Sequence, residues 1–148
     1  MMSNSIFLTL HIVTIFVSFA AFFAATVSAM LYLAQDRNLK RKEAVVLSSR
    51  LPDLDFLDKF NYRAIGFGFP LLTLGIISAS FLAKQIWGVY WVWNFRDSYS
   101  LILWLIYAVT LHVRLTSKLR GKKIAWLSIV AFVVIVIIIF AGVCEAIK

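Results

Sequence analysis

Long apolar runs alternate with short polar segments along the whole chain. Four of these runs are long enough to cross the hydrocarbon core of a bilayer, which is about 30 Å thick and takes about 20 helical residues. The runs extend over 6–34, 65–83, 99–115 and 124–143. The pattern therefore predicts an all-α integral membrane protein with four transmembrane helices, folded as a single membrane domain over 1–148.

The composition fits a membrane protein and excludes several classes of function. Of the 148 residues, 62% are hydrophobic, and the mean hydropathy is +0.90, whereas apolar residues make up about half of a soluble domain. The sequence contains no glycine-rich phosphate loop, metal-spaced Cys/His cluster or nucleophile motif, so nothing indicates a self-contained hydrolase or kinase. The single cysteine, Cys144, permits no internal disulfide, and we interpret it as a small apolar filler.

The first run could be a cleaved signal peptide or a permanent membrane helix. The residues before it carry no positive side chain, and the apolar run is longer than such peptides need. We therefore expect this run to remain as a transmembrane helix.

Lysine and arginine are distributed unevenly among the polar segments. Seven lie between the first and second runs and five in the turn from Arg114, at the end of the third run, to the fourth, while only Lys84, Arg96 and Lys148 lie elsewhere. Because basic connections stay in the cytoplasm, we predict that both basic segments face inward. Both termini and the segment between the second and third runs then face outward. The net charge of +8 thus indicates topology and attraction to anionic lipid on the cytoplasmic side, not a nucleic-acid partner.

The cytoplasmic connector 35–63 has an amphipathic pattern at its centre. Leucines and Phe56 are interleaved with acids in Ser48–Asp58, and Pro52 suits the first turn of a short helix. We interpret this part as a short amphipathic segment on the membrane interface, with a plain connector as the alternative. Three glycines in the run that follows favour close approach of a neighbouring helix.

The segment between the second and third runs is the most informative part of the chain. It combines several aromatic rings with Arg96, and the spacing of Trp87, Trp91 and Trp93 predicts one flat aromatic platform. Aromatic rings stack on the face of a planar ligand, and a guanidinium binds carboxylates in bidentate fashion. Haem has such a face and such carboxylates, so we predict that these four residues bind haem. An ordinary aromatic belt at the membrane interface is the alternative.

The two histidines of the chain lie inside predicted membrane helices. We expect His11 near the level of the tryptophan-rich loop and His112 roughly 20 Å deeper, at 1.5 Å per helical residue. Ionisable residues inside membrane helices are functional candidates, and histidine is the usual axial ligand of haem there. We therefore predict two separate axial ligands of haem iron. For either residue, the alternative is a neutral imidazole bonded to a neighbouring carbonyl or to Tyr107.

The tryptophan-rich segment also carries a family resemblance. Trp87–Asp97 followed by Leu101–Arg114 resembles the signature of the cytochrome c assembly family, and is most similar to the CcsA/ResC haem-channel branch and the HemX-like proteins, as a short form. The similarity extends over Leu31–Leu33, Leu51–Asp58, Gly68–Gly75 and Arg120–Gly121. It thus covers nearly the whole chain in order.

The resemblance implies that the protein moves or holds haem during cytochrome c maturation. In that family the tryptophan-rich loop presents haem on the outer face between two external histidines, and a second histidine pair lies in the membrane. By position, His11 is similar to the first external ligand and His112 to the second ligand of the membrane pair. Trp87, Trp91 and Trp93 correspond to the stacking platform.

The chain departs from the family pattern in two respects. Asn94 stands where the family usually has aspartate, and Phe95–Asp97 replaces Pro-Lys-Glu. The second external histidine and the helices before His11, which carry the other membrane histidine in longer relatives, have no counterpart in the sequence. We therefore expect each haem site to be half present. A second polypeptide, a homodimer, or loss of haem binding can each account for this.

These arguments favour a multi-pass component of the cell inner (cytoplasmic) membrane that handles haem in c-type cytochrome biogenesis. The expected partners are haem b, apocytochrome c, and a ResB/CcsB-like membrane protein or a second chain that completes the histidine pairs. The chain is not expected to be an enzyme on its own, but it fits a subunit of a cytochrome c haem lyase. The alternatives are a HemX-like regulator of tetrapyrrole synthesis with weak or no haem binding, and an apolar scaffold without a ligand.

Overall fold

The chain forms four long helices. The computed structural model describes residues 2–41, 51–117, 119 and 121–148, and their side chains except those of 2–4 and 96. The helices are α1 (Met2–Arg41), α3 (Leu54–Trp87), α4 (Phe95–Thr116) and α5 (Lys122–Ile147). All four are long and apolar enough to cross a membrane, and the described residues contain no strand. The predicted all-α membrane fold is confirmed.

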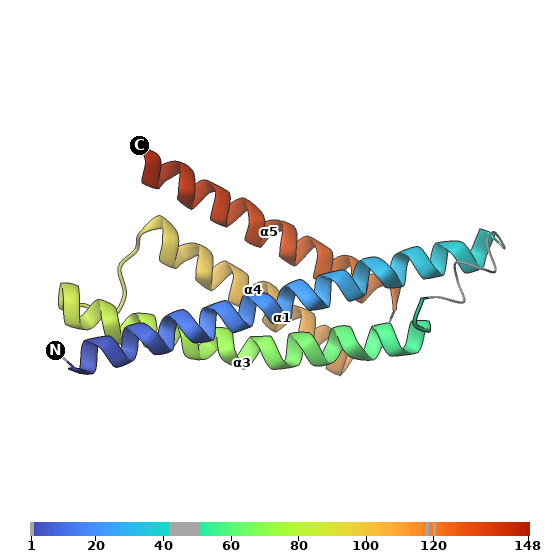
Figure 1. The fold of residues 1–148 in the computed structure, drawn as a ribbon, viewed down its shortest axis with the longest axis horizontal. Coiled ribbons are helices and arrows are strands. Elements are labelled where there is room, and N and C mark those ends of the chain that lie inside the picture. Colours follow the sequence, from blue (N-terminus) through green and yellow to red (C-terminus); the bar gives the residue numbers. More distant parts are fainter. Residues whose placement is uncertain (1, 42–50, 118, 120) are drawn as a thin grey trace.

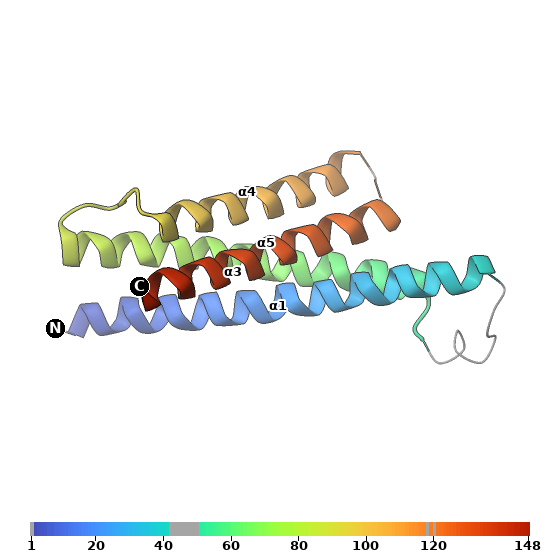
Figure 2. The ribbon, with the colours of Figure 1, turned by 90° about the horizontal axis from the view of Figure 1, so that it is seen from above.

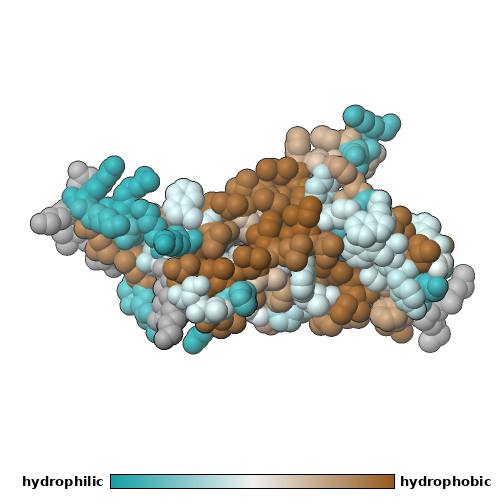
Figure 3. Space-filling view, turned by 180° about the vertical axis from the view of Figure 1, so that it is seen from behind, coloured by the Kyte–Doolittle hydropathy of each residue, from teal (hydrophilic) through white to brown (hydrophobic). Residues whose placement is uncertain are grey.

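The surface is that of a protein surrounded by lipid. An apolar band covers the middle of the molecule, and hydrophilic residues gather towards its ends (Figure 3). Phe16 on α1 and Phe140 on α5 are 75% and 71% exposed. Large apolar side chains so exposed are unfavourable in water but not in hydrocarbon. The helical form follows from the same environment, because a helix satisfies its own backbone hydrogen bonds where no water is available.

The helices run up and down the bundle, with α1 and α3 in contact along most of their length (Figures 1 and 2). α5 packs on α1 and α4, and α4 packs on α3. α5 diverges from α1 towards its carboxyl end (Figure 1). Both chain termini and the loop between α3 and α4 lie at one end of the bundle, which we call the tryptophan end. The ends of α1 and α4 and the starts of α3 and α5 lie at the other, which we call the basic end.

The helices at the basic end are longer than the apolar runs. Residues 35–41 continue α1, and 54–63 form the first turns of α3. The part of the predicted interfacial segment at 54–58 therefore belongs to a long helix, while 48–50 lie outside the described residues. Leu57 is buried, and the hydroxyl of Ser28 donates to its carbonyl oxygen at 2.7 Å. This packing on α1 extends the helix beyond the apolar run.

Small residues bring α1 and α3 together, as the glycines of α3 predicted. A Cβ atom added at Gly68 would lie 2.8 Å from the Phe22 ring, and one at Gly75 would lie 2.5 Å from Ile15 Cδ1. Gly66 faces open space instead. The hydroxyl of Ser18 donates to the carbonyl oxygen of Gly68 at 2.9 Å. Close backbone approach combined with hydrogen bonds between helices is how membrane helices associate without a hydrophobic driving force.

Candidate functional site

The tryptophan-rich loop is folded back over the end of α3. The helix stops after Trp87 because Gly88 adopts a left-handed conformation (φ 76°), and its N–H donates to the carbonyl oxygen of Lys84. The ammonium of Lys84 donates to the carbonyl oxygen of Gly88 at 2.8 Å and lies 5.0 Å from the centre of the Tyr90 ring. The ring of Tyr90 also meets that of Phe81 edge-on. These contacts give the loop a defined shape.

The indole rings of the loop do not form a flat surface. Trp91 and Trp93 lie 6.1 Å apart, with 72° between their ring planes. The prediction of one flat platform is therefore wrong for this pair, because aromatic rings at this distance prefer the edge-to-face arrangement. Trp87 and Trp93 are 61% and 81% exposed, whereas Trp91 is partly buried. Trp91 Nε1 is buried without a hydrogen-bond partner among the described residues.

The loop ends at a well-formed start of α4. The side-chain oxygen of Asn94 accepts from the backbone N–H of Asp97 at 2.8 Å, which is the hydrogen bond of a helix N-cap. Aspartate, which the related family carries here, makes the same bond, so the exchange keeps the turn and removes a charge. Arg96 lies in the first turn of α4, and its side chain lies outside the described residues. Its predicted contact with haem carboxylates stays a prediction.

His11 belongs to α1, and its half-buried ring lies against α3. Nδ1 is 2.8 Å from the carbonyl oxygen of Gly75. Because a carbonyl only accepts, Nδ1 carries the proton and donates, and Nε2 is left with a free lone pair. Histidine ligands of metals almost always donate their other ring N–H in this way. The hydrogen bond to a carbonyl, which was the alternative to a role as iron ligand, is present. It is also compatible with that role, because it fixes the ring and leaves Nε2 free.

His11 lies deeper in the bundle than the sequence suggested. Its partner Gly75 precedes Trp87 by twelve residues of α3, a rise of about 18 Å along the helix axis. Tyr90, which folds back onto Phe81, lies closer to it, since Phe81 follows Gly75 by six residues, a rise of about 9 Å. Trp87 and Tyr90 therefore lie nearer the tryptophan end than His11 does, while the loop runs back from the end of α3 to the start of α4 (Figures 1 and 2).

His112 lies near the basic end of α4 on the outer face of the bundle, where it is exposed. The hydroxyl of Thr116 donates to the carbonyl oxygen of His112 at 2.7 Å and lies 3.4 Å from its Nε2. Two residues further along, Arg114 pairs with Asp58 of α3. Asp58 precedes Gly75 by 17 residues of α3, or about 25 Å of helix. The two histidines are thus not brought together.

Tyr107 is not a partner of either histidine. Its ring is fully buried and stacked on that of Phe22, with centroids 3.7 Å apart and planes within 7°. Its hydroxyl has no hydrogen-bond partner among the described residues. Tyr107 acts in the apolar core, and the alternative that pairs it with an imidazole is wrong.

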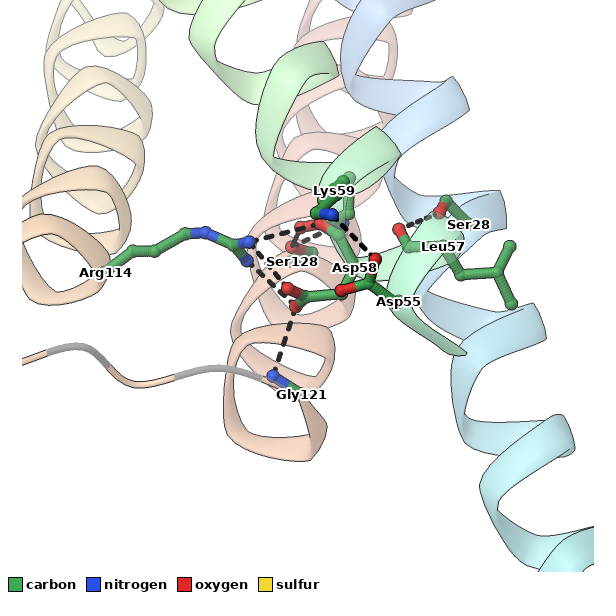
Figure 4. A network of polar contacts seen from close by, with 9 residues as sticks. Ser28, Asp55, Leu57, Asp58, Lys59, Arg114, Gly121 and Ser128 are labelled. Carbon is green, nitrogen blue, oxygen red and sulfur yellow. Dashed lines mark hydrogen bonds and ion pairs between the residues drawn. The ribbon is translucent and has the colours of Figure 1, made fainter. Parts of the chain in front are cut away.

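Sequence reasoning missed a polar cluster at the basic end. It consists of Asp58 of α3, Arg114 of α4 and Gly121 before α5 (Figure 4), together with Tyr62 of α3, and we call it the Asp58 cluster. A signal was present, because an acid among leucines and an arginine at the end of an apolar helix each require a partner at the membrane edge. The pairing itself joins residues 56 positions apart.

These features define a multi-pass α-helical membrane protein with an aromatic loop at one end and one half-buried histidine below it. The chain belongs to the cytochrome C assembly protein family, whose model matches residues 1–143.

Three curated relatives illustrate the similarity. The cytochrome c biogenesis protein CcsA of Guillardia theta is 33% identical over 147 residues, which are 89% of this chain and 49% of the relative. The CcsA proteins of Crocosphaera subtropica and Synechocystis are 46% and 45% identical over 64% and 62% of this chain, and over 29% and 28% of their own lengths. The chain thus spans about half, or less, of these relatives. No solved structure matches it.

Proposed function

We propose that this protein is a haem-handling membrane component of c-type cytochrome biogenesis, and that its tryptophan-rich loop presents haem at the outer face. The observation that carries the proposal is the exposure of two indole rings at one end of the bundle, Trp87 at 61% and Trp93 at 81%. Membership of the cytochrome C assembly family, with relatives named cytochrome c biogenesis protein CcsA, supports the same role.

The sidedness of the proposal rests on charge. Twelve of the 15 lysines and arginines lie in the two segments that connect at the basic end. Basic connections stay on the cytoplasmic side, so the tryptophan end faces outward. In a cell with c-type cytochromes outside the cytoplasmic membrane, the loop then faces apocytochrome c. The basic end faces the anionic lipid of the inner leaflet.

The residues of the loop and of α1 supply different parts of a haem site. The exposed faces of Trp87 and Trp93 can stack on a porphyrin, and the partly buried Trp91 has an indole N–H free to donate. His11, oriented by the carbonyl oxygen of Gly75, has Nε2 free for iron. We propose that His11 would hold the iron of a bound haem and that Trp87 and Trp93 would stack on its porphyrin. The haem is haem b, held without a covalent bond.

His11 and His112 lie at different depths, so this chain offers only one histidine ligand at each of the two proposed haem positions. We propose that a second polypeptide, a ResB/CcsB-like membrane protein or another chain with histidines, supplies the opposite ligand. His112 on the outer face of α4 serves a separate, deeper haem position. An ionisable residue on a lipid-facing surface is costly, whereas one that faces a neighbouring helix or a ligand is not.

The proposal is tested by haem binding of the detergent-purified protein, read from the Soret band. Replacing Trp87 and Trp93 together by alanine removes two ring contacts of about 1 kcal/mol each, which weakens haem binding by roughly 30-fold. The matched control is Trp126→Ala, because Trp126 is also an exposed tryptophan (52%) but lies near the start of α5, at the basic end.

The loop variant and the control must differ for the proposal to stand. Equal haem occupancy in the double variant, the Trp126 variant and the parent would identify the rings as an interfacial aromatic belt. Absence of a Soret band in the parent, even with the partner co-expressed, would favour a regulatory protein of the HemX type instead.

A further inference from the structure

The Asp58 cluster joins three helices at the basic end through one carboxylate. Arg114 Nη2 donates to Asp58 Oδ2 at 2.7 Å, and Nη1 donates to Oδ1 at 3.0 Å. Nη2 also lies 3.3 Å from the carbonyl oxygen of Asp58. The backbone N–H of Gly121 donates to Oδ1 at 3.1 Å. Figure 4 shows Arg114 reaching from α4 across to this carboxylate, with Gly121 approaching it from α5.

The geometry of the pair fixes direction as well as distance. Both side chains are nearly buried, with 10% of Arg114 and 12% of Asp58 exposed. The planar guanidinium matches the two carboxylate oxygens, and the Tyr62 ring lies 4.6 Å from its central carbon. A guanidinium held by two parallel hydrogen bonds and one ring face keeps a single orientation. The last turn of α4 is therefore fixed in rotation relative to α3.

That rotation determines where His112 points. His112 precedes Arg114 by two residues, so the two side chains leave the helix about 200° apart. With Arg114 directed into the bundle, His112 is directed out of it, as its exposure confirms. Thr116, one turn below, contacts the same imidazole and does not hold the helix to a neighbour. Arg114 is thus the interhelical anchor nearest to His112, below the buried Thr110 and Tyr107 on the same face of α4.

We propose that Asp58 and Arg114 are positioning residues that set the orientation of His112 for haem at the deeper position. This inference rests on the proposed function of His112. The pair contacts no haem itself. It acts through the backbone of α4, one step further from the ligand than the groups that hydrogen-bond a ligating imidazole directly.

The test uses the full chain with its partner and separates position from stability. Asp58→Leu combined with Arg114→Met removes both charges at similar volume, a replacement that buried ion pairs tolerate with little loss of stability. The positioning role predicts a normal unfolding temperature and His112-dependent haem binding weaker by about tenfold, with a shifted Soret band. Arg114→Lys keeps the charge but loses the two parallel hydrogen bonds, and gives the same spectral shift. The matched control is Asp55→Asn, because the Asp55–Lys59 pair lies on the same helix and is 64% and 61% exposed.

Each outcome bears on one of the two proposals. His112→Ala without effect on haem removes the function proposed for His112, whatever the pair does. If His112→Ala lowers haem but the Leu/Met double variant and Arg114→Lys bind haem with the parental spectrum, the pair is only structural, and the positioning inference is wrong. Loss of haem in the Asp55→Asn control would also overturn it, because any change of charge at this end would then suffice.

Discussion

The imidazole of His11 on α1 lies 2.8 Å from the carbonyl oxygen of Gly75 on α3, although the two residues are 64 positions apart. The contact exists because Gly75 has no side chain, so the two helices approach closely at this level. It gives one histidine both a structural partner and a free ring nitrogen. The first two predictions concern this contact.

Replacing His11 should separate its structural role from ligation. His11→Gln retains an amide N–H that can reach the Gly75 carbonyl oxygen, but it lacks the imidazole nitrogen that binds iron. We expect this variant to unfold within about 1 kcal/mol of the parent while its haem spectrum changes. His11→Ala should lose both the hydrogen bond to Gly75 and the nitrogen that binds iron, and added imidazole should restore part of the Soret band. A parental spectrum in the Gln variant would show that His11 is only a structural residue.

Replacing Gly75 should push α1 away from α3. A methyl group there meets the side chain of Ile15 at 2.5 Å, so we expect Gly75→Ala to destabilise the bundle by about 1–3 kcal/mol. The control is Gly66→Ala on the same helix, where nothing lies within 4 Å. This control should be unchanged or up to about 1 kcal/mol more stable, because alanine favours helix. Thermal unfolding in detergent measures both, and equal effects would contradict the close contact.

Two glycines with the same backbone angle should respond differently to alanine. Gly88 and Gly121 have φ values of 76° and 77°, but only Gly121 faces another group, the hydroxyl of Tyr32. Gly88→Ala should therefore cost about 1–2 kcal/mol from backbone strain alone. Gly121→Ala should cost more, because its ψ of −128°, against −2° at Gly88, is harder for alanine to adopt and because the added methyl group meets the Tyr32 hydroxyl. Tyr32→Phe should recover only the part that the hydroxyl contact contributes. The unfolding temperatures of the two alanine variants should rank in that order.

The N-cap of α4 should tolerate aspartate but not alanine. Asn94→Asp keeps the oxygen that accepts from the Asp97 N–H, so we expect unchanged stability. Asn94→Ala loses the bond and should destabilise the protein by about 1 kcal/mol. If the missing family aspartate matters for haem, Asn94→Asp will also alter the Soret band, and the stability measurement shows that folding is not the cause.

Labelling of single cysteines should establish the orientation of the bundle. In a Cys144→Ser background, a membrane-impermeant maleimide added outside should label Gln85→Cys, near the tryptophan end, and should leave Asp55→Cys unlabelled until the membrane is opened. Val130→Cys, exposed in the apolar band of α5, serves as the lipid-facing control. Labelling of Asp55→Cys from outside would reverse the topology and remove the proposed presentation of haem at the outer face.

The sequence alone determined the class of this protein. A helix that crosses a membrane satisfies its backbone hydrogen bonds within itself, so apolar length is enough to predict four of them. The continuation of α1 over 35–41 and the joining of 54–63 to the second membrane helix were not predicted, because they depend on the packing of Leu57 against α1 and not on local hydropathy. The residue types of the tryptophan-rich loop also made it the candidate site.

Only the tertiary structure decided how the candidate residues face one another. The angle between Trp91 and Trp93, the carbonyl partner of His11 and the pairing of Asp58 with Arg114 all join groups whose placement depends on loop geometry or helix rotation. Hydropathy fixes that a helix crosses the membrane but not which face meets a neighbour, since lipid accepts any apolar face. The faces are selected by glycines that allow close approach and by buried polar groups that must find a partner.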